Sequence, residues 1–165
     1  MIDIKNCFTY AYSAGTFADF YQNVAADAES TNVIDLWAQT SLQTGEAGLR
    51  ITGKNGPYLI VKTFAVNPDT GISLNIQLCS STSTTVSSAY IIAQYRFLTA
   101  NMAASATTGA LLINQQLPIG KYYRYLGIYF NVFTSFGAAT LYLCAYLSDA
   151  PERAEQVLGQ VVPAT

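Results

Sequence analysis

Apolar and polar residues alternate along several stretches of the chain, and this alternation predicts β-strands. Residues 72–80 give the clearest case, because positions 72, 74, 76 and 78 are Ile or Leu and the positions between them are polar or Cys. A period of two places one set of side chains in a core. Apolar runs at 58–66, 90–98 and 111–117 are separated by segments rich in Gly, Pro, Asn and Ser. About six or more such strands between residues 31 and 148 predict an all-β, antiparallel two-sheet sandwich, jelly-roll-like in its connections.

Two strands near the C-terminal end have an unusual pattern. Residues 123–133 and 139–148 each pair an aliphatic face with a tyrosine-rich face. We expect a loop around Gly137 to join them as a hairpin. A solvated sheet face is normally polar, so the second side of this hairpin is predicted to be covered, either by another layer of the same domain or by another subunit. The residues predicted to make this second contact are Tyr125, Tyr129, Tyr142 and Tyr146.

Both ends of the chain lack this alternation. Residues 1–29 are aromatic but follow no period, and they predict an irregular N-terminal arm that lies on its own sandwich or on a neighbour. Residues 30–148 form the predicted sandwich domain. Residues 149–165 predict a C-terminal tail with a short helix between Pro151 and Gly159. Candidate interface residues in these ends are Phe8, Tyr10, Tyr12, Phe17, Phe20, Tyr21, Val157 and Leu158.

The composition points to a protein whose surface is partly covered by a partner. Hydrophobic residues make up 51 % of the chain and charged residues only 11 %, against about 25 % charged in an average globular chain. The net charge is -2 and the Lys and Arg residues are scattered, so the sequence predicts no basic patch that would bind nucleic acid. We find no pattern of a signal peptide and no apolar run long enough for a membrane span.

The residue types needed for catalysis are largely missing. The chain has no histidine, which excludes Ser-His-Asp and Cys-His arrangements. Cys7, Cys79 and Cys144 follow no metal-ligand spacing. We expect Cys79 and Cys144 to be reduced, packed and inert, because no cation neighbours them in sequence. Most carboxylates fall in turns or in the ends of the chain. We therefore expect no enzyme, no catalytic residue, no metal and no cofactor, although a carboxylate-based glycosidase stays open.

Several ordered motifs resemble a known family of viral proteins. They are the segment Ser-Thr-Asn-Val-Ile-Asp-Leu at 30–36, Leu-Pro-Ile-Gly at 117–120, Arg-Tyr-Leu-Gly-Ile-Tyr-Phe at 124–130, and the Ala- and Leu-rich strand at 139–147. In this order and spacing, over roughly residues 20–148, the chain is similar to the capsid cement (decoration) proteins of tailed bacteriophages.

The resemblance implies a jelly-roll-like sandwich without catalytic residues. It implies a small homo-oligomer that binds the outer capsid surface of the virion, over junctions between major capsid proteins. From the tyrosine-rich face and the apolar tail we expect a homodimer or homotrimer, and the free cysteines indicate synthesis in the cytoplasm of the bacterial host. The sequence departs from the family in its longer aromatic arm and in its tail beyond Pro151. The alternative is a carbohydrate-binding jelly-roll adhesion module, which would need exposed Trp or Tyr beside Asp and Asn in loops; the single Trp37 gives it little support.

Overall fold

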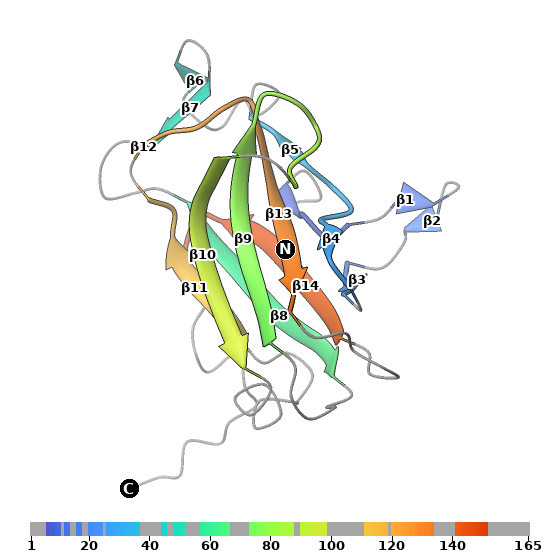
Figure 1. Ribbon diagram of the computed structural model, residues 1–165. Coiled ribbons are helices and arrows are strands. Elements are labelled where there is room, and N and C mark those ends of the chain that lie inside the picture. Colours follow the sequence, from blue (N-terminus) through green and yellow to red (C-terminus); the bar gives the residue numbers. More distant parts are fainter. Residues whose placement is uncertain are drawn as a thin grey trace, which may run out of the picture.

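The computed structural model describes residues 6–10, 12–13, 16–17, 20–24, 26–36, 44–45, 48–51, 57–66, 73–87, 90–98, 111–118, 120–133 and 141–151. All regular elements in these ranges are strands (Figure 1). The long strands are β8 (Tyr58–Val66), β9 (Ser73–Ser81), β10 (Tyr90–Leu98), β11 (Leu111–Gln116), β13 (Tyr125–Val132) and β14 (Leu141–Ser148). The short ones are β1 (Tyr12–Ser13), β2 (Thr16–Phe17), β3 (Gln22–Asn23), β4 (Ala28–Glu29), β5 (Ile34–Asp35), β6 (Thr44–Gly45), β7 (Gly48–Ile51) and β12 (Gly120–Lys121).

Two antiparallel sheets form the body of the protein. One has the strand order β11-β8-β14-β3, and the other has the order β10-β9-β13-β4, with β5 also paired to β13. Strands that follow each other in sequence mostly lie in opposite sheets, so the chain winds around the sandwich, and only β9 and β10 form a long hairpin. This winding is the jelly-roll topology. The predicted fold class is confirmed.

The predicted hairpin between residues 123–133 and 139–148 is wrong. β13 pairs with β9 over eight residue pairs from Tyr125 to Val132, whereas β14 pairs with β8 in the other sheet. The alternation along each strand correctly identified an aliphatic inner face, but it contains no information about which strand lies beside which. The two aliphatic faces meet across the core instead of lying side by side.

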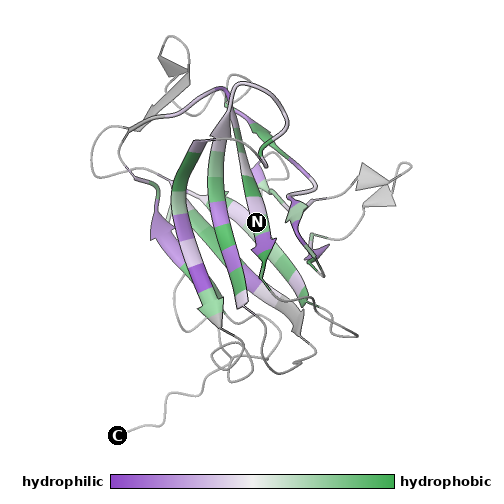
Figure 2. Ribbon diagram, in the orientation of Figure 1, coloured by the Kyte–Doolittle hydropathy of each residue, from purple (hydrophilic) through white to green (hydrophobic). Residues whose placement is uncertain are grey.

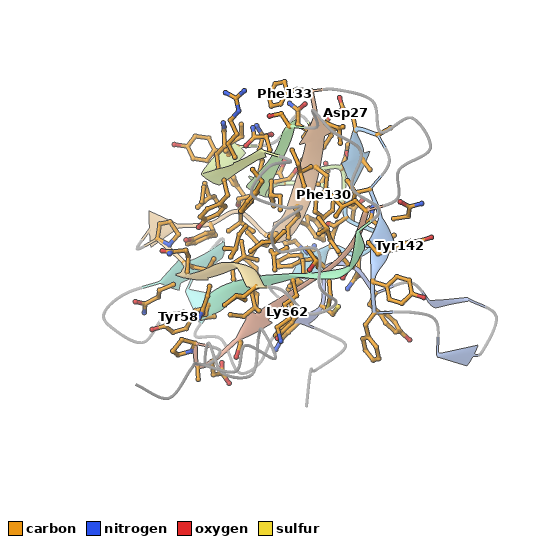
Figure 3. All side chains as sticks on the ribbon, turned by 90° about the horizontal axis from the view of Figure 1, so that it is seen from below. Asp27, Tyr58, Lys62, Phe130, Phe133 and Tyr142 are labelled. Atoms are coloured by element: carbon orange, nitrogen blue, oxygen red, sulfur yellow. The ribbon has the colours of Figure 1, made fainter. Side chains whose placement is uncertain are left out.

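The core fills the space between the two sheets. Leu74, Ile76 and Leu78 of β9 face inward from one layer, and Leu59 and Val61 of β8 face inward from the other. Figure 3 shows the two layers end-on, with Phe130 between them. Phe133 and Asp27 lie on one side of the sandwich, and Tyr58 and Lys62 lie on the other. The inner faces inferred from the period of two are therefore the observed ones.

Part of the N-terminal range is built into both sheets. β3 pairs with β14, and β4 pairs with β13. Further along the same edge of β14, Cys7 lies opposite Tyr146 in an isolated bridge, and the Phe8 amide donates to the Ala145 carbonyl at 2.8 Å. Residues 22–29, which we assigned to the arm, thus belong to the sandwich itself.

Two small sheets project from the sandwich in Figure 1. β6, β7 and β12 form one, and β1 and β2 form the other. The helix predicted in the tail, with Val157 and Leu158, lies outside the residues that the structure describes. Among the residues that are described, no helix is long and apolar enough to cross a membrane.

Candidate interaction surfaces

The N-terminal segment 6–10 runs along the edge of β14 and places Cys7 and Tyr10 on the outer face of the β8–β14 sheet. Cys7 and Tyr10 pack with Ile60 and Tyr146 in a second apolar cluster, outside the main core. The buried Thr9 hydroxyl fixes the segment, because it accepts from the Ala145 amide at 3.0 Å and donates to the Phe20 carbonyl at 2.8 Å. This stretch of the arm therefore lies on its own domain.

This arrangement changes the interpretation of the aromatic residues of the arm. Phe8 is fully buried in the main core, so it is not a surface contact as we predicted, and Tyr10 is 9 % exposed. Phe20 remains 38 % exposed beside Tyr10, with ring centroids 5.8 Å apart. Tyr21 packs edge-on against Tyr142 at 5.2 Å. The side chains of Tyr12 and Phe17 lie outside the described part.

The tyrosines that we grouped on one face are divided between two opposite faces. Tyr142 and Tyr146 lie on the outer face of the β8–β14 sheet, whereas Tyr125 and Tyr129 lie on the outer face of the β9–β13 sheet. Tyr146 is buried under the N-terminal segment, and the other three are half-buried. The expected covering of the second side is thus provided, for Tyr146, by the chain itself.

A loop folds back over the outer face of the other sheet. Val86, in the segment after β9, is fully buried against Gly127 of β13. A Cβ atom at position 127 would lie 2.7 Å from Val86 Cγ1, so the close approach requires glycine. The Glu29 carboxylate holds the loop, accepting from the amides of Val86 at 3.2 Å and Ser87 at 2.8 Å. These hydrogen bonds, with that of the Ser87 side chain as the largest cause, lower the pKa of Glu29.

Polar side chains cross the rest of this outer face in rows, visible as purple bands on β9 and β10 in Figure 2. Gln94, Gln77 and Tyr129 form one row across three strands, and the Gln77 amide donates to Gln94 at 3.4 Å. The next row contains Asn75, which is 2 % exposed and whose Oδ1 has no hydrogen-bond partner in the described part of the structure. Arg96 lies opposite Asn75 in the same row, so this face offers amide groups and a guanidinium rather than an apolar contact.

Exposed apolar side chains gather at one end of this sheet. Tyr90 is 70 % exposed, Ile91 46 % and Tyr123 50 %. Tyr90 lies opposite Ser80 in the strand register, and the Ser80 hydroxyl accepts from the Tyr123 amide at 2.6 Å, so both tyrosines lie beside Ser80. Ile91 lies opposite Cys79 and points to the other face of the strand. We call Tyr90 and Tyr123 the Tyr90–Tyr123 patch. No local signal separated them from the other strand aromatics in the sequence.

A salt bridge lies next to the patch. Arg124 makes a two-pronged contact with Asp35, with Nη2 to Oδ2 at 2.7 Å and Nε to Oδ1 at 3.0 Å. The guanidinium also lies 4.9 Å from the centre of the Tyr125 ring. The hydrogen bond that Arg124 donates to Asp35 raises the pKa of Arg124. Asp35 of β5 is thus held by an arginine at the rim of the patch.

The three cysteines differ in their surroundings and in the pKa of their thiols. Burial raises the pKa of Cys79 to about 11, as expected for an inert thiol. Cys7 and Cys144 instead pack in the same apolar cluster on the outer face of the β8–β14 sheet, which the sequence did not suggest. Within the described ranges, no three His, Cys, Asp or Glu side chains are grouped so that they could hold a metal ion. That the protein is not an enzyme stays a prediction.

The fold and these surfaces define an all-β jelly-roll protein with exposed aromatic side chains at both ends of the β9–β13 sheet. The family model Bbp16 matches residues 17–143, which is most of the chain. The chain therefore belongs to the Bbp16 family, which is phage-associated. No match to a curated protein was found.

Proposed function

We propose that the protein is a capsid cement protein of a tailed bacteriophage, which binds the outer surface of the shell across junctions between major capsid subunits. Membership of a phage-associated family, the jelly-roll fold and the resemblance of the ordered motifs support this function. The observation that carries it is the Tyr90–Tyr123 patch, because large exposed aromatic side chains are typical anchors of protein interfaces.

The proposed action is physical and needs no catalysis. A ligand that spans a junction binds only the closed arrangement of the subunits, so it stabilises that arrangement by mass action. A homodimer or homotrimer that touches several subunits at once gains further affinity, since its second contact is intramolecular. In this function the patch docks on the major capsid protein, and the Arg124–Asp35 pair forms part of the polar rim.

The test compares exposed aromatic residues at the two ends of β13. We expect the double substitution Tyr90→Ala and Tyr123→Ala to weaken binding of the full-length protein to empty shells at least about 30-fold, since a hot-spot side chain contributes about 2 kcal/mol or more and 1.4 kcal/mol corresponds to tenfold. Phe133→Ala is the matched control, because Phe133 is 57 % exposed at the other end. Co-sedimentation with shells measures both.

The outcomes test separately whether the patch is the docking surface and whether the protein is a cement protein at all. Unchanged binding of the double variant, or an equal loss with Phe133→Ala, would show that the patch is not the docking surface. If the intact protein binds no shell of its own phage, the cement function itself is wrong.

The second candidate function is carbohydrate binding, and the polar rows on the β9–β13 sheet favour it. Exposed amide side chains such as Gln94 pair with sugar hydroxyls, and the exposed Phe133 ring, with the Arg96 guanidinium 5.5 Å from its centre, offers a surface on which a sugar can stack. A glycan array with the full-length protein tests it. Binding that is lost in Phe133→Ala and kept in the Tyr90→Ala, Tyr123→Ala double variant would support this function over the first.

A further inference from the structure

Two cysteines from opposite ends of the chain meet on the covered face of the β8–β14 sheet. Cys7 lies opposite Tyr146 across an antiparallel bridge, and Cys144 lies two residues before Tyr146, on the same side of β14. The register therefore places the two thiols on the same outer face of the sheet, in diagonal positions on neighbouring segments. Both belong to the cluster that also contains Tyr10 and Ile60. Cys7 is fully buried, whereas Cys144 is partly exposed.

The surroundings of this pair favour one thiolate. Lys62 of β8 lies directly opposite Cys144 in the strand register, and its ammonium group is 5.8 Å from the centre of the Tyr146 ring. The hydrogen bond from Cys144, followed by those from Thr9, lowers the pKa of Cys7 to about 7. The same hydrogen bond raises the pKa of Cys144, because its ionisation would place a second negative charge beside the first. The pair thus shares one proton near neutral pH.

We propose that Cys7 and Cys144 are an oxidation site, at which a peroxide converts the two thiols into an intramolecular disulfide that fastens the N-terminal segment to β14. The inference does not depend on the proposed function, because neither cysteine lies in the Tyr90–Tyr123 patch. It concerns what happens to the chain once it leaves a reducing cytoplasm.

The chemistry requires hydrogen peroxide as the oxidant. With the shared proton on Cys144, the Cys7 thiolate attacks one peroxide oxygen; an S–O bond forms, the O–O bond breaks, and hydroxide leaves. The Cys144 sulfur then attacks the sulfenic sulfur of Cys7. The S–S bond forms, the S–O bond breaks, and the Cys144 proton leaves with the hydroxyl group as water. The proton that the pair had already released neutralises the first hydroxide, so two thiols and one peroxide give one disulfide and two waters.

The position of the disulfide explains what it would do for the fold. Cys7 and Ala145, the neighbour of Cys144, are 138 positions apart in sequence. A cross-link that closes so long a loop removes much of the conformational entropy of the unfolded chain. The N-terminal segment carries Phe8 into the core, so holding this segment in place also holds a core side chain. Cys79 cannot join, because it lies on the opposite sheet against Gly127.

The experiment exposes the full-length protein to hydrogen peroxide and then alkylates all remaining thiols under denaturing conditions. We expect intact-mass spectrometry to show one alkylated thiol instead of three, and non-reducing peptide maps to show a Cys7–Cys144 link. The melting temperature should rise by more than about 5 °C on oxidation and fall back to its original value when dithiothreitol reduces the disulfide. Cys79→Ser is the matched control, and it should form the same link with no thiol left to alkylate.

Three results would overturn the proposal: full alkylation at Cys7 and Cys144 after peroxide treatment, a sulfinic acid on either cysteine in place of the link, or a disulfide that includes Cys79. These readouts use the unaltered chain, so they do not depend on whether Cys7→Ser or Cys144→Ser folds. In those two variants, where they fold, the rise in melting temperature should disappear.

Discussion

The outer faces of the two sheets look alike in sequence and differ in the structure. Both strands that define them, β13 and β14, alternate aliphatic residues with tyrosines. On the face of β14, Tyr146 is buried together with Cys7 and Tyr10 of the segment paired to its edge. On the face of β13, Val86 lies against Gly127, and among the described residues polar rows and exposed aromatic side chains occupy the rest. What covers a sheet face is therefore decided by segments far from the strand itself.

This difference determines which surface is left for a partner. The covering of β14 uses buried residues with saturated hydrogen bonds, such as Thr9 between Ala145 and Phe20. Such a segment contributes to folding and is a poor candidate for reversible contact. The β13 sheet keeps its large apolar side chains at its ends, with the Tyr90–Tyr123 patch at one and Phe133 at the other. The aromatic arm that seemed the best interface in the sequence is thus, at Cys7–Tyr10, part of the fold.

The largest expected effect concerns the covered face. Phe8→Ala should lower the free energy of unfolding by about 3–5 kcal/mol, because it removes a fully buried ring from the core and leaves a cavity. Urea denaturation followed by tryptophan or tyrosine fluorescence measures it. Phe20→Ala, at a partly exposed position of the same arm, should cost less than about 1 kcal/mol. Equal and small effects at both positions would mean that the arm does not plug the sandwich.

The next effect concerns the open face and its loop. Gly127→Ala should cost about 1–3 kcal/mol, since the new methyl group would overlap Val86 at 2.7 Å. In a Val86→Ala background the same substitution should cost much less, because space is then available. A double-mutant cycle in urea should give a coupling of about 1 kcal/mol or more. Additive effects would show that the loop does not press on β13 in solution.

The sequence was sufficient for the fold class but not for the surfaces, and the reason is the range of the interactions. Inner faces follow from the period of two, so Leu74, Ile76 and Leu78 were placed correctly. Strand partners, the burial of Phe8 and the contact of Cys7 with Cys144 depend on pairings between distant segments, about which local alternation is silent. Lys62 illustrates this point, because no cation neighbours Cys144 in sequence and yet Lys62 faces it across the sheet.

The smallest expected effect is on the pH dependence of the free energy of unfolding, and it concerns the β13 face, where Glu29 holds the loop. The folded protein lowers the pKa of Glu29, so this carboxylate stabilises the fold above the ordinary range of glutamate titration, and its contribution is lost as the pH falls through that range towards the lowered value. Because Glu29 is largely solvated, Glu29→Gln should cost less than about 1 kcal/mol at neutral pH. The variant should also lose less stability than the parent between neutral and acid pH.

The physical reason is that a neutral amide holds the loop amides of Val86 and Ser87 less strongly than a carboxylate does, and does so equally at every pH in this range. Ser87→Ala removes the largest cause of the lowered pKa, so it should flatten the acid decline in the same direction. Phe20→Ala, on the arm, should leave the decline as steep as in the parent. Urea midpoints at a series of pH values measure all three, and a Glu29→Gln profile parallel to that of the parent would show that the covering of the β13 face does not depend on this charge.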